Sequence, residues 1–126
     1  MSIDGGRLNW IVLIVFAPIL ILAGVLGFVL PESAGLTSGA PAYNWFHIAF
    51  GTLGLLLALT KKESYARAFN LGFGLIDLYQ AAASFLHLFP ENHFRWTRAD
   101  DVLHVVIGAL LVGVALYGRS GRGART

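Results

Sequence analysis

The sequence predicts an all-α membrane protein, with four transmembrane helices that run up, down, up and down in a bundle made of two duplicated helical hairpins. Three observations support this fold. Hydrophobic residues make up 56% of the 126 residues and charged residues only 13%. Four apolar segments are separated by short polar connections, and the second half of the chain repeats features of the first. A soluble fold of this length could not bury so much apolar surface, so we expect one membrane domain, residues 1–126.

The four apolar segments predict spans at about residues 8–30, 42–60, 66–89 and 100–118. At about 1.5 Å per residue, the first and third are long enough for a hydrocarbon core of about 30 Å. The second and fourth are shorter and carry polar residues in their first turns, so we expect them to begin in the headgroup region. The arginine-containing residues 119–126 predict a basic cytoplasmic tail that contacts anionic lipid.

The distribution of Lys and Arg predicts the orientation. Seven of them lie before the first span, after the second span or after the fourth, whereas the other connections hold only Arg95 and Arg98. We therefore expect a multi-pass protein of the inner (plasma) membrane with both termini in the cytoplasm. The expected partner is the lipid bilayer, and no basic patch indicates nucleic acid. The absence of cysteine excludes thiolate metal sites and cysteine nucleophiles.

An internal repeat is the most informative feature of the sequence. Residues 44–51 read NWFHIAFG and residues 101–108 read DVLHVVIG, so the histidines and glycines match at an offset of 57. A second match places Pro-Glu at 31–32 and again at 90–91. Two hairpins repeated in parallel are related by an axis along the membrane normal, which puts His47 and His104 at equal depth.

The sequence at 27–31, GFVLP, closes the first span, and paired His-x-x-x-Gly helices follow. This combination is similar to a bacterial family of small four-span integral membrane proteins of unknown function, and the resemblance covers nearly the whole chain. It implies the four-span topology and no activity.

The histidine pair has two interpretations. Imidazoles that face each other across a bundle could hold a divalent metal or the iron of a haem at His47 and His104. Asn44 and Asp101 precede them by three residues, on the same helical face, and could orient the rings. Alternatively, the small residues below each histidine permit close helix packing, and the imidazoles bond to a neighbouring helix or to water.

Three further residues extend the expected metal site. His87 is a candidate third ligand, and Glu32 and Glu91 each follow the proline at the outer end of a span. A carboxylate at a helix C-terminus opposes the helix dipole, and a nearby cation would relieve it. The alternative is that the prolines have already ended the helices and the glutamates are simply solvated.

The third span carries a polar stripe. Asn70, Asp77, Gln80, Ser84 and His87 fall within about 100° on a helix with 3.6 residues per turn. A charged Asp near the bilayer centre costs roughly 2.5–3.5 kcal/mol on insertion scales, and no Lys or Arg is expected at that depth. The acid is therefore either a proton or ion site or a buried polar clasp, and Gln80 and Thr52 are its expected partners. The first-span positions opposite the acid are Pro18 and its apolar neighbours, so the acid is not duplicated.

These features lead to three function hypotheses. The first is a structural or interaction membrane protein, with a homo-oligomer formed through Gly-rich faces. The second is a metal- or haem-binding protein that uses His47 and His104. The third is a proton-coupled transporter or channel component that uses Asp77. The sequence shows no nucleophile–base pair and no phosphate-binding loop, so we expect no catalytic residues.

Overall fold

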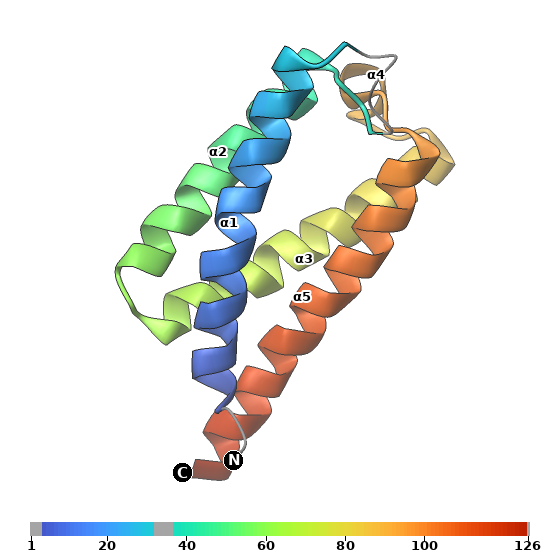
Figure 1. Cartoon of the computed structure of the whole chain (residues 1–126). Coiled ribbons are helices and arrows are strands. Elements are labelled where there is room, and N and C mark those ends of the chain that lie inside the picture. The colour runs from blue at the N-terminus through green and yellow to red at the C-terminus, as the bar shows by residue number, and fades with distance from the viewer. Residues whose placement is uncertain (1–3, 32–36, 126) are drawn as a thin grey trace.

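The computed structural model describes residues 4–31 and 37–125, with side chains up to residue 118. Every regular element in these ranges is a helix: α1 (Gly5–Val29), α2 (Pro41–Leu59), α3 (Glu63–Leu86), the short α4 (Glu91–Phe94) and α5 (Arg98–Arg125). The long helices run antiparallel to their neighbours in the chain (Figure 1). The start of α1 and the end of α5 lie at the lower end of the figure, and α4 lies beside residues 37–40 at the upper end.

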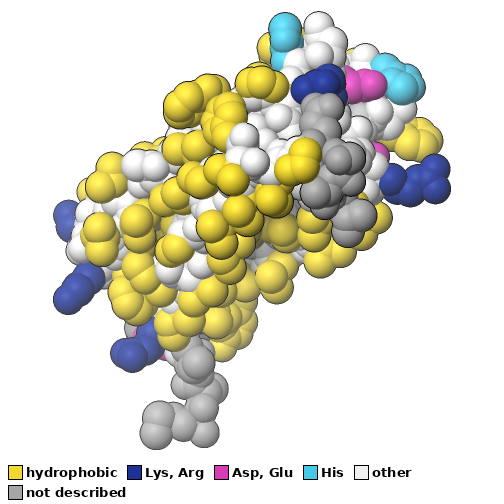
Figure 2. All heavy atoms as spheres, turned by 45° about the horizontal axis from the view of Figure 1, so that its top comes forward, with side chains coloured by type: hydrophobic (Ala, Val, Ile, Leu, Met, Phe, Trp, Pro, Cys, Tyr) yellow, Lys and Arg dark blue, Asp and Glu magenta, His cyan; other side chains and the backbone are white. Residues whose placement is uncertain are grey.

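Within the described part of the chain, three helices are long and apolar enough to cross a membrane: α1, α2 and residues Arg98–Gly118 of α5. Their outer surfaces expose large apolar side chains, including Val15, Ile19, Leu56 and Leu110. Figure 2 shows apolar side chains over most of the visible face, with basic side chains gathered toward its ends. These features indicate a membrane protein. The helix α3, which holds Arg67 and Asp77, is not among the three candidate spans.

Local sequence accounts for the helix ends. Asp4 accepts hydrogen bonds from the backbone N–H groups of Gly6 and Arg7 and so caps α1. Pro41 occupies the first turn of α2, where its missing N–H costs nothing. His87 adopts the left-handed conformation, with φ 59°, and ends α3 three residues before the predicted boundary.

The predicted tail requires a correction. The backbone of α5 continues as a helix to Arg125, although we expected residues 119–126 to lie beyond the last helix. Extending an existing helix adds one hydrogen bond for each residue ordered, so the polar segment follows the apolar one without a break.

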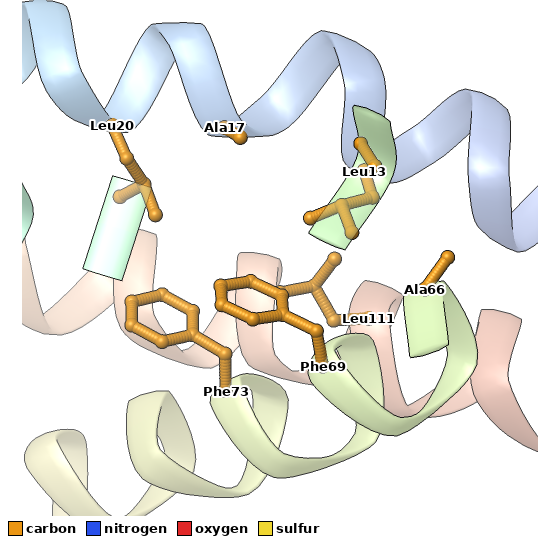
Figure 3. Close-up of a cluster of buried hydrophobic side chains, with 8 residues drawn as sticks. Leu13, Ala17, Leu20, Ala66, Phe69, Phe73 and Leu111 are labelled. Atoms are coloured by element: carbon orange, nitrogen blue, oxygen red, sulfur yellow. The ribbon is translucent and has the colours of Figure 1, made fainter. Parts of the chain in front are cut away.

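The hydrophobic core lies between α1, α2, α3 and α5 (Figure 3). Leu13, Ala17 and Leu20 of α1 face Phe73 of α3 and Leu111 of α5. The helix α1 packs against α2, α3 and α5, and α3 likewise contacts all the other long helices. The two central helices therefore join the α1–α2 hairpin to the α3–α5 hairpin.

The two hairpins share one pattern of side-chain hydrogen bonds. The indole Nε1 of Trp10 donates to the carbonyl of Ala58 at 2.8 Å. The guanidinium Nε of Arg67 donates to the carbonyl of Ala115 at 2.9 Å. Donor and acceptor are both displaced by 57 positions, from 10 to 67 and from 58 to 115. Two chemically different side chains therefore make the same contact in each hairpin.

The glycines repeat the same relation. A Cβ atom on Gly51 would lie 3.0 Å from the carbonyl oxygen of Ala17, and one on Gly108 would lie 2.9 Å from that of Gly74. The helix ends agree, since α1 ends at Val29 and α3 at Leu86. Each hairpin thus has a glycine at a close helix approach, and the two glycines are again 57 positions apart.

These contacts follow the offset of 57 that the matched His-x-x-x-Gly segments predict. The Pro-Glu matches at 31–32 and 90–91 are 59 positions apart in the sequence, two more than the contacts that join the helices. At the offset of 57, the position that corresponds to Asp77 is Leu20, one of the apolar residues near Pro18. Pro31 and Pro90 both lie outside the long helices, where residues can shift without disturbing helix packing.

Candidate functional site

The site is built around Asp100 in the first turn of α5. The backbone N–H of Thr97 donates to its Oδ2 at 2.8 Å, and its own N–H donates to the Thr97 hydroxyl at 3.2 Å. The sequence Thr97-Arg98-Ala99-Asp100 predicts a capping box at this helix start, and these two bonds confirm it. The backbone N–H of Ser38 and the hydroxyl of Tyr43 also donate to the same carboxylate. The side chain of Asp100 is buried, with 1% of its surface exposed. Its bonds to Ser38 and Tyr43 join the α1–α2 connection and α2 to α5.

Tyr43 connects this carboxylate to a histidine. Its hydroxyl oxygen lies 3.1 Å from Oδ1 of Asp100 and 2.7 Å from Nε2 of His104. When the hydroxyl donates to Asp100, its oxygen accepts from Nε2–H of His104, which leaves Nδ1 of that ring as an acceptor. That nitrogen is buried and has no hydrogen-bond partner among the described residues.

The residues predicted to orient the imidazoles are Asn44 and Asp101, and Tyr43 is not among them. The amide nitrogen of Asn44 donates to the carbonyl of Gly39 at 3.0 Å, and the amide fills the space above Gly27 of α1. Oδ1 of Asp101 has no partner among the described residues. The 57-residue offset was the available signal, because it pairs Tyr43 with Asp100.

His47 also lies against the ring of Tyr43. The two ring centroids are 4.1 Å apart, and the ring of His104 lies 5.9 Å from that of Tyr43. Nδ1 of His47 is buried and unpartnered within the described part of the chain. The structure thus brings the two histidines to one aromatic ring, from α2 and from α5.

Both histidines line a cavity of about 240 Å³ between the two hairpins. Its lining includes four pairs of residues that are 57 positions apart: Phe16 with Phe73, Leu20 with Asp77, Tyr43 with Asp100, and His47 with His104. The rings of the first pair are 5.8 Å apart. The cavity therefore lies where equivalent positions of the two hairpins meet.

Asp77 is 3% exposed and brings a carboxyl group to this cavity. The amide nitrogen of Gln80 donates to its Oδ1 at 3.1 Å, and the amide oxygen of Gln80 accepts from the indole of Trp96 at 3.0 Å. The expected partnership with Gln80 is confirmed. The one with Thr52 is wrong, because that side chain is exposed on α2. The described cavity lining contains no Lys or Arg.

The other residues of the stripe differ in burial. Asn70 is fully buried, and its amide nitrogen donates to Oδ1 of Asn9 at 3.0 Å. Ser84 is partly buried. The side chain of His87 is 80% exposed, because α3 has already ended there. The stripe thus faces the protein interior along most of α3 and leaves it at the last residue.

The described residues that were expected to bind a metal do not lie together in one site. Nδ1 of His87 lies 2.9 Å from Oε2 of Glu91, in a pair separate from the cavity that holds His47 and His104. Glu32 lies outside the described residues. Within the described ranges, no cluster of three His, Asp or Glu side chains could hold a metal ion.

The geometry also disfavours haem. Nε2 of His104 lies 2.7 Å from the hydroxyl of Tyr43, so this nitrogen is already in a hydrogen bond and is not free to bind iron. The cavity of about 240 Å³ is smaller than the roughly 300–1,000 Å³ of sites that hold larger ligands. The residues present therefore fit a small molecule better than a porphyrin.

Comparison with protein-family models, curated proteins and solved structures found no match to this chain. The resemblance to a bacterial four-span family stays a prediction.

Proposed function

We propose that this chain is a four-span inner-membrane protein, with both termini in the cytoplasm and two duplicated hairpins related by an axis along the membrane normal. The equivalent bonds of Trp10 and Arg67 support the duplication, as do the equivalent close contacts of Gly51 and Gly108. In this arrangement α3 is the third span. Its polar residues Asn70, Asp77 and Gln80 are buried against the other helices and do not meet lipid.

The function we propose is proton-coupled transport, in which this chain is a component and Asp77 binds and releases the proton. One observation carries this proposal: Asp77 is buried within the bundle yet lines a cavity that it shares with His47 and His104. Acids within membrane segments are rare, and those that face an internal cavity mark proton or ion pathways.

The chemistry of the cavity suits proton transfer. A carboxylate in this environment, with no basic side chain among the described lining residues, is stabilised by taking up a proton. Imidazoles exchange protons readily, and a hydroxyl can accept one hydrogen bond and donate another. His104, Tyr43 and Asp100 form such a chain toward the end of the bundle that carries α4.

The other two hypotheses have less support. An oligomer through Gly-rich faces requires glycines that are free to contact a second chain. Gly24, Gly51, Gly74 and Gly108 are closely approached by residues of the same chain, which leaves Gly72 and Gly113 as open positions on the described helices. A metal or haem protein requires converging ligands, and the histidines converge on Tyr43 instead.

Proton flux into proteoliposomes tests the function. We expect the reconstituted protein to acidify a vesicle that holds an internal pH dye when a potassium diffusion potential is imposed. Asp77→Asn should reduce this flux by about tenfold or more, because the amide cannot carry the proton. Asp101→Asn is the matched control, since it makes the same change on α5 away from the cavity lining. Equal flux in wild type and Asp77→Asn would refute the proposal.

Cysteine labelling tests the topology independently. The chain has no cysteine, so single substitutions give a clean signal. Asn92→Cys should react with an impermeant thiol reagent added outside the cell, and Lys62→Cys should react only after the membrane is opened. Both positions are exposed. Labelling of both from one side would contradict a third span through α3.

A further inference from the structure

We propose that the cavity binds a small organic cation, an amine whose ammonium group meets Asp77 and whose apolar body lies against the rings of Phe16 and Phe73. This inference deepens the proposed function by naming a substrate class, and it rests on the premise that the Asp77 cavity is the site of activity.

The charge of the lining selects a cation. Asp77 and Asp100 both line the cavity, and the described lining contains no Lys or Arg. The carboxylate of Asp100 already accepts from Thr97, Ser38 and Tyr43. The only side-chain donor that the structure gives Asp77 is Gln80. A cationic donor would therefore find its uncompensated partner at Asp77.

The remaining polar groups add acceptors. Nδ1 of His104 is buried in a side chain that is 5% exposed, and it has no partner among the described residues. The tautomer that donates to Tyr43 makes this nitrogen an acceptor. An ammonium group brings several N–H donors and no acceptor, which matches a cavity whose open positions accept hydrogen bonds.

The apolar walls require an organic body. The rest of the cavity lining is largely apolar and includes Phe16, Leu20, Phe73 and Ile107. Aromatic faces attract cations and also pack against rings. An apolar cavity of about 150 Å³ in another protein holds benzene. The volume here, about 240 Å³, leaves room for a ring and a short chain that ends in an amine.

Calorimetric titration of the full chain in nanodiscs tests the inference, with empty nanodiscs as the blank for partitioning into lipid. Phenethylamine is the probe, phenethyl alcohol is its neutral counterpart and phenylacetate is its anionic one. We expect the amine to bind best and phenylacetate not to bind. Asp77→Asn should weaken amine binding by about tenfold or more, because a charge-assisted hydrogen bond is lost, and should leave the alcohol unchanged.

Two further variants separate steric from electrostatic effects. Ala23→Phe adds a ring at the cavity wall and should abolish binding of both the amine and the alcohol. Asp101→Asn should change neither. Size-exclusion chromatography of each variant checks that the bundle is intact. Equal affinity for amine and alcohol, an unchanged amine affinity in Asp77→Asn, or no binding of any probe would overturn the inference.

The outcomes also separate this inference from the proposed function. If proton flux depends on Asp77 but the amine does not bind, the ligand class is wrong and the transport proposal stands. If the amine binds through Asp77 but no proton flux occurs, the protein is a binding protein and the transport proposal fails.

Discussion

The α1–α2 and α3–α5 hairpins use the same contacts for packing and different residues for chemistry. Gly51 and Gly108 make equivalent close approaches, and the carbonyls of Ala58 and Ala115 accept equivalent side-chain bonds. At the cavity, by contrast, Leu20 of the first hairpin corresponds to Asp77 of the second. Helix packing is intolerant of changes in shape, whereas a cavity wall tolerates a change of polarity. The positions where the hairpins differ are therefore the ones to examine for function.

The histidines show the opposite case. His47 and His104 are identical in the two hairpins, but their surroundings are not. Tyr43 donates to Asp100 and lies within hydrogen-bond distance of His104, whereas its ring packs against His47. Two equivalent imidazoles thus have different partners because one counterpart is a phenol and the other is a carboxylate. Identity at related positions does not imply identical chemistry.

The largest effect is expected when both hairpins carry the same residue at the cavity position where they now differ. Asp77→Leu gives both hairpins the same residue at this position and should abolish proton flux. It should also raise the free energy of unfolding by about 2 kcal/mol, because the cost of a membrane-buried acid exceeds the lost bond to Gln80. Equilibrium unfolding in mixed micelles measures this change. The reciprocal Leu20→Asp should destabilise the bundle. A destabilised Asp77→Leu protein would instead identify Asp77 as a packing clasp.

The second prediction concerns the glycines that the hairpins share. Gly51→Ala and Gly108→Ala should each lower the free energy of unfolding by about 1–3 kcal/mol, because the added methyl group would meet backbone atoms of the partner helix. Gly72→Ala and Gly113→Ala are matched controls, since nothing lies within 4 Å of the added Cβ. In these control variants the free energy of unfolding should rise by up to about 1 kcal/mol, because Ala has a higher helix propensity than Gly. Effects of the same sign in both sets would contradict the equivalent packing.

The smallest effect concerns the shared hydrogen bonds. Trp10→Phe and Arg67→Met each remove one hydrogen-bond donor to a helix carbonyl. Each should therefore lower the free energy of unfolding by about 1 kcal/mol. The two sites lie in different hairpins, so the double variant should show the sum within about 0.5 kcal/mol. The same unfolding assay measures all three proteins. A larger departure from the sum of the two single effects would mean that the two hydrogen bonds are energetically coupled.

The sequence by itself determined the features that depend on neighbouring residues. Apolar composition and length identified the long helices, and the Thr97–Asp100 spacing identified the capping box. The helical period placed Asp77 and Gln80 on one face, where they bond to each other. Each of these follows from backbone geometry within a few residues of the chain, so no knowledge of the other helices was needed.

Only the tertiary structure decided which residues meet across helices. The bond from Tyr43 to Asp100 joins residues 57 apart, and it took the place expected for Asp101 beside His104. The left-handed turn at His87 carried that side chain away from the other histidines. The cavity is lined by residues of α1, α2, α3 and α5, and no local sequence pattern specifies how these helices meet. Helical periodicity specifies the face of a helix, whereas the partner of that face depends on the packing of all four long helices.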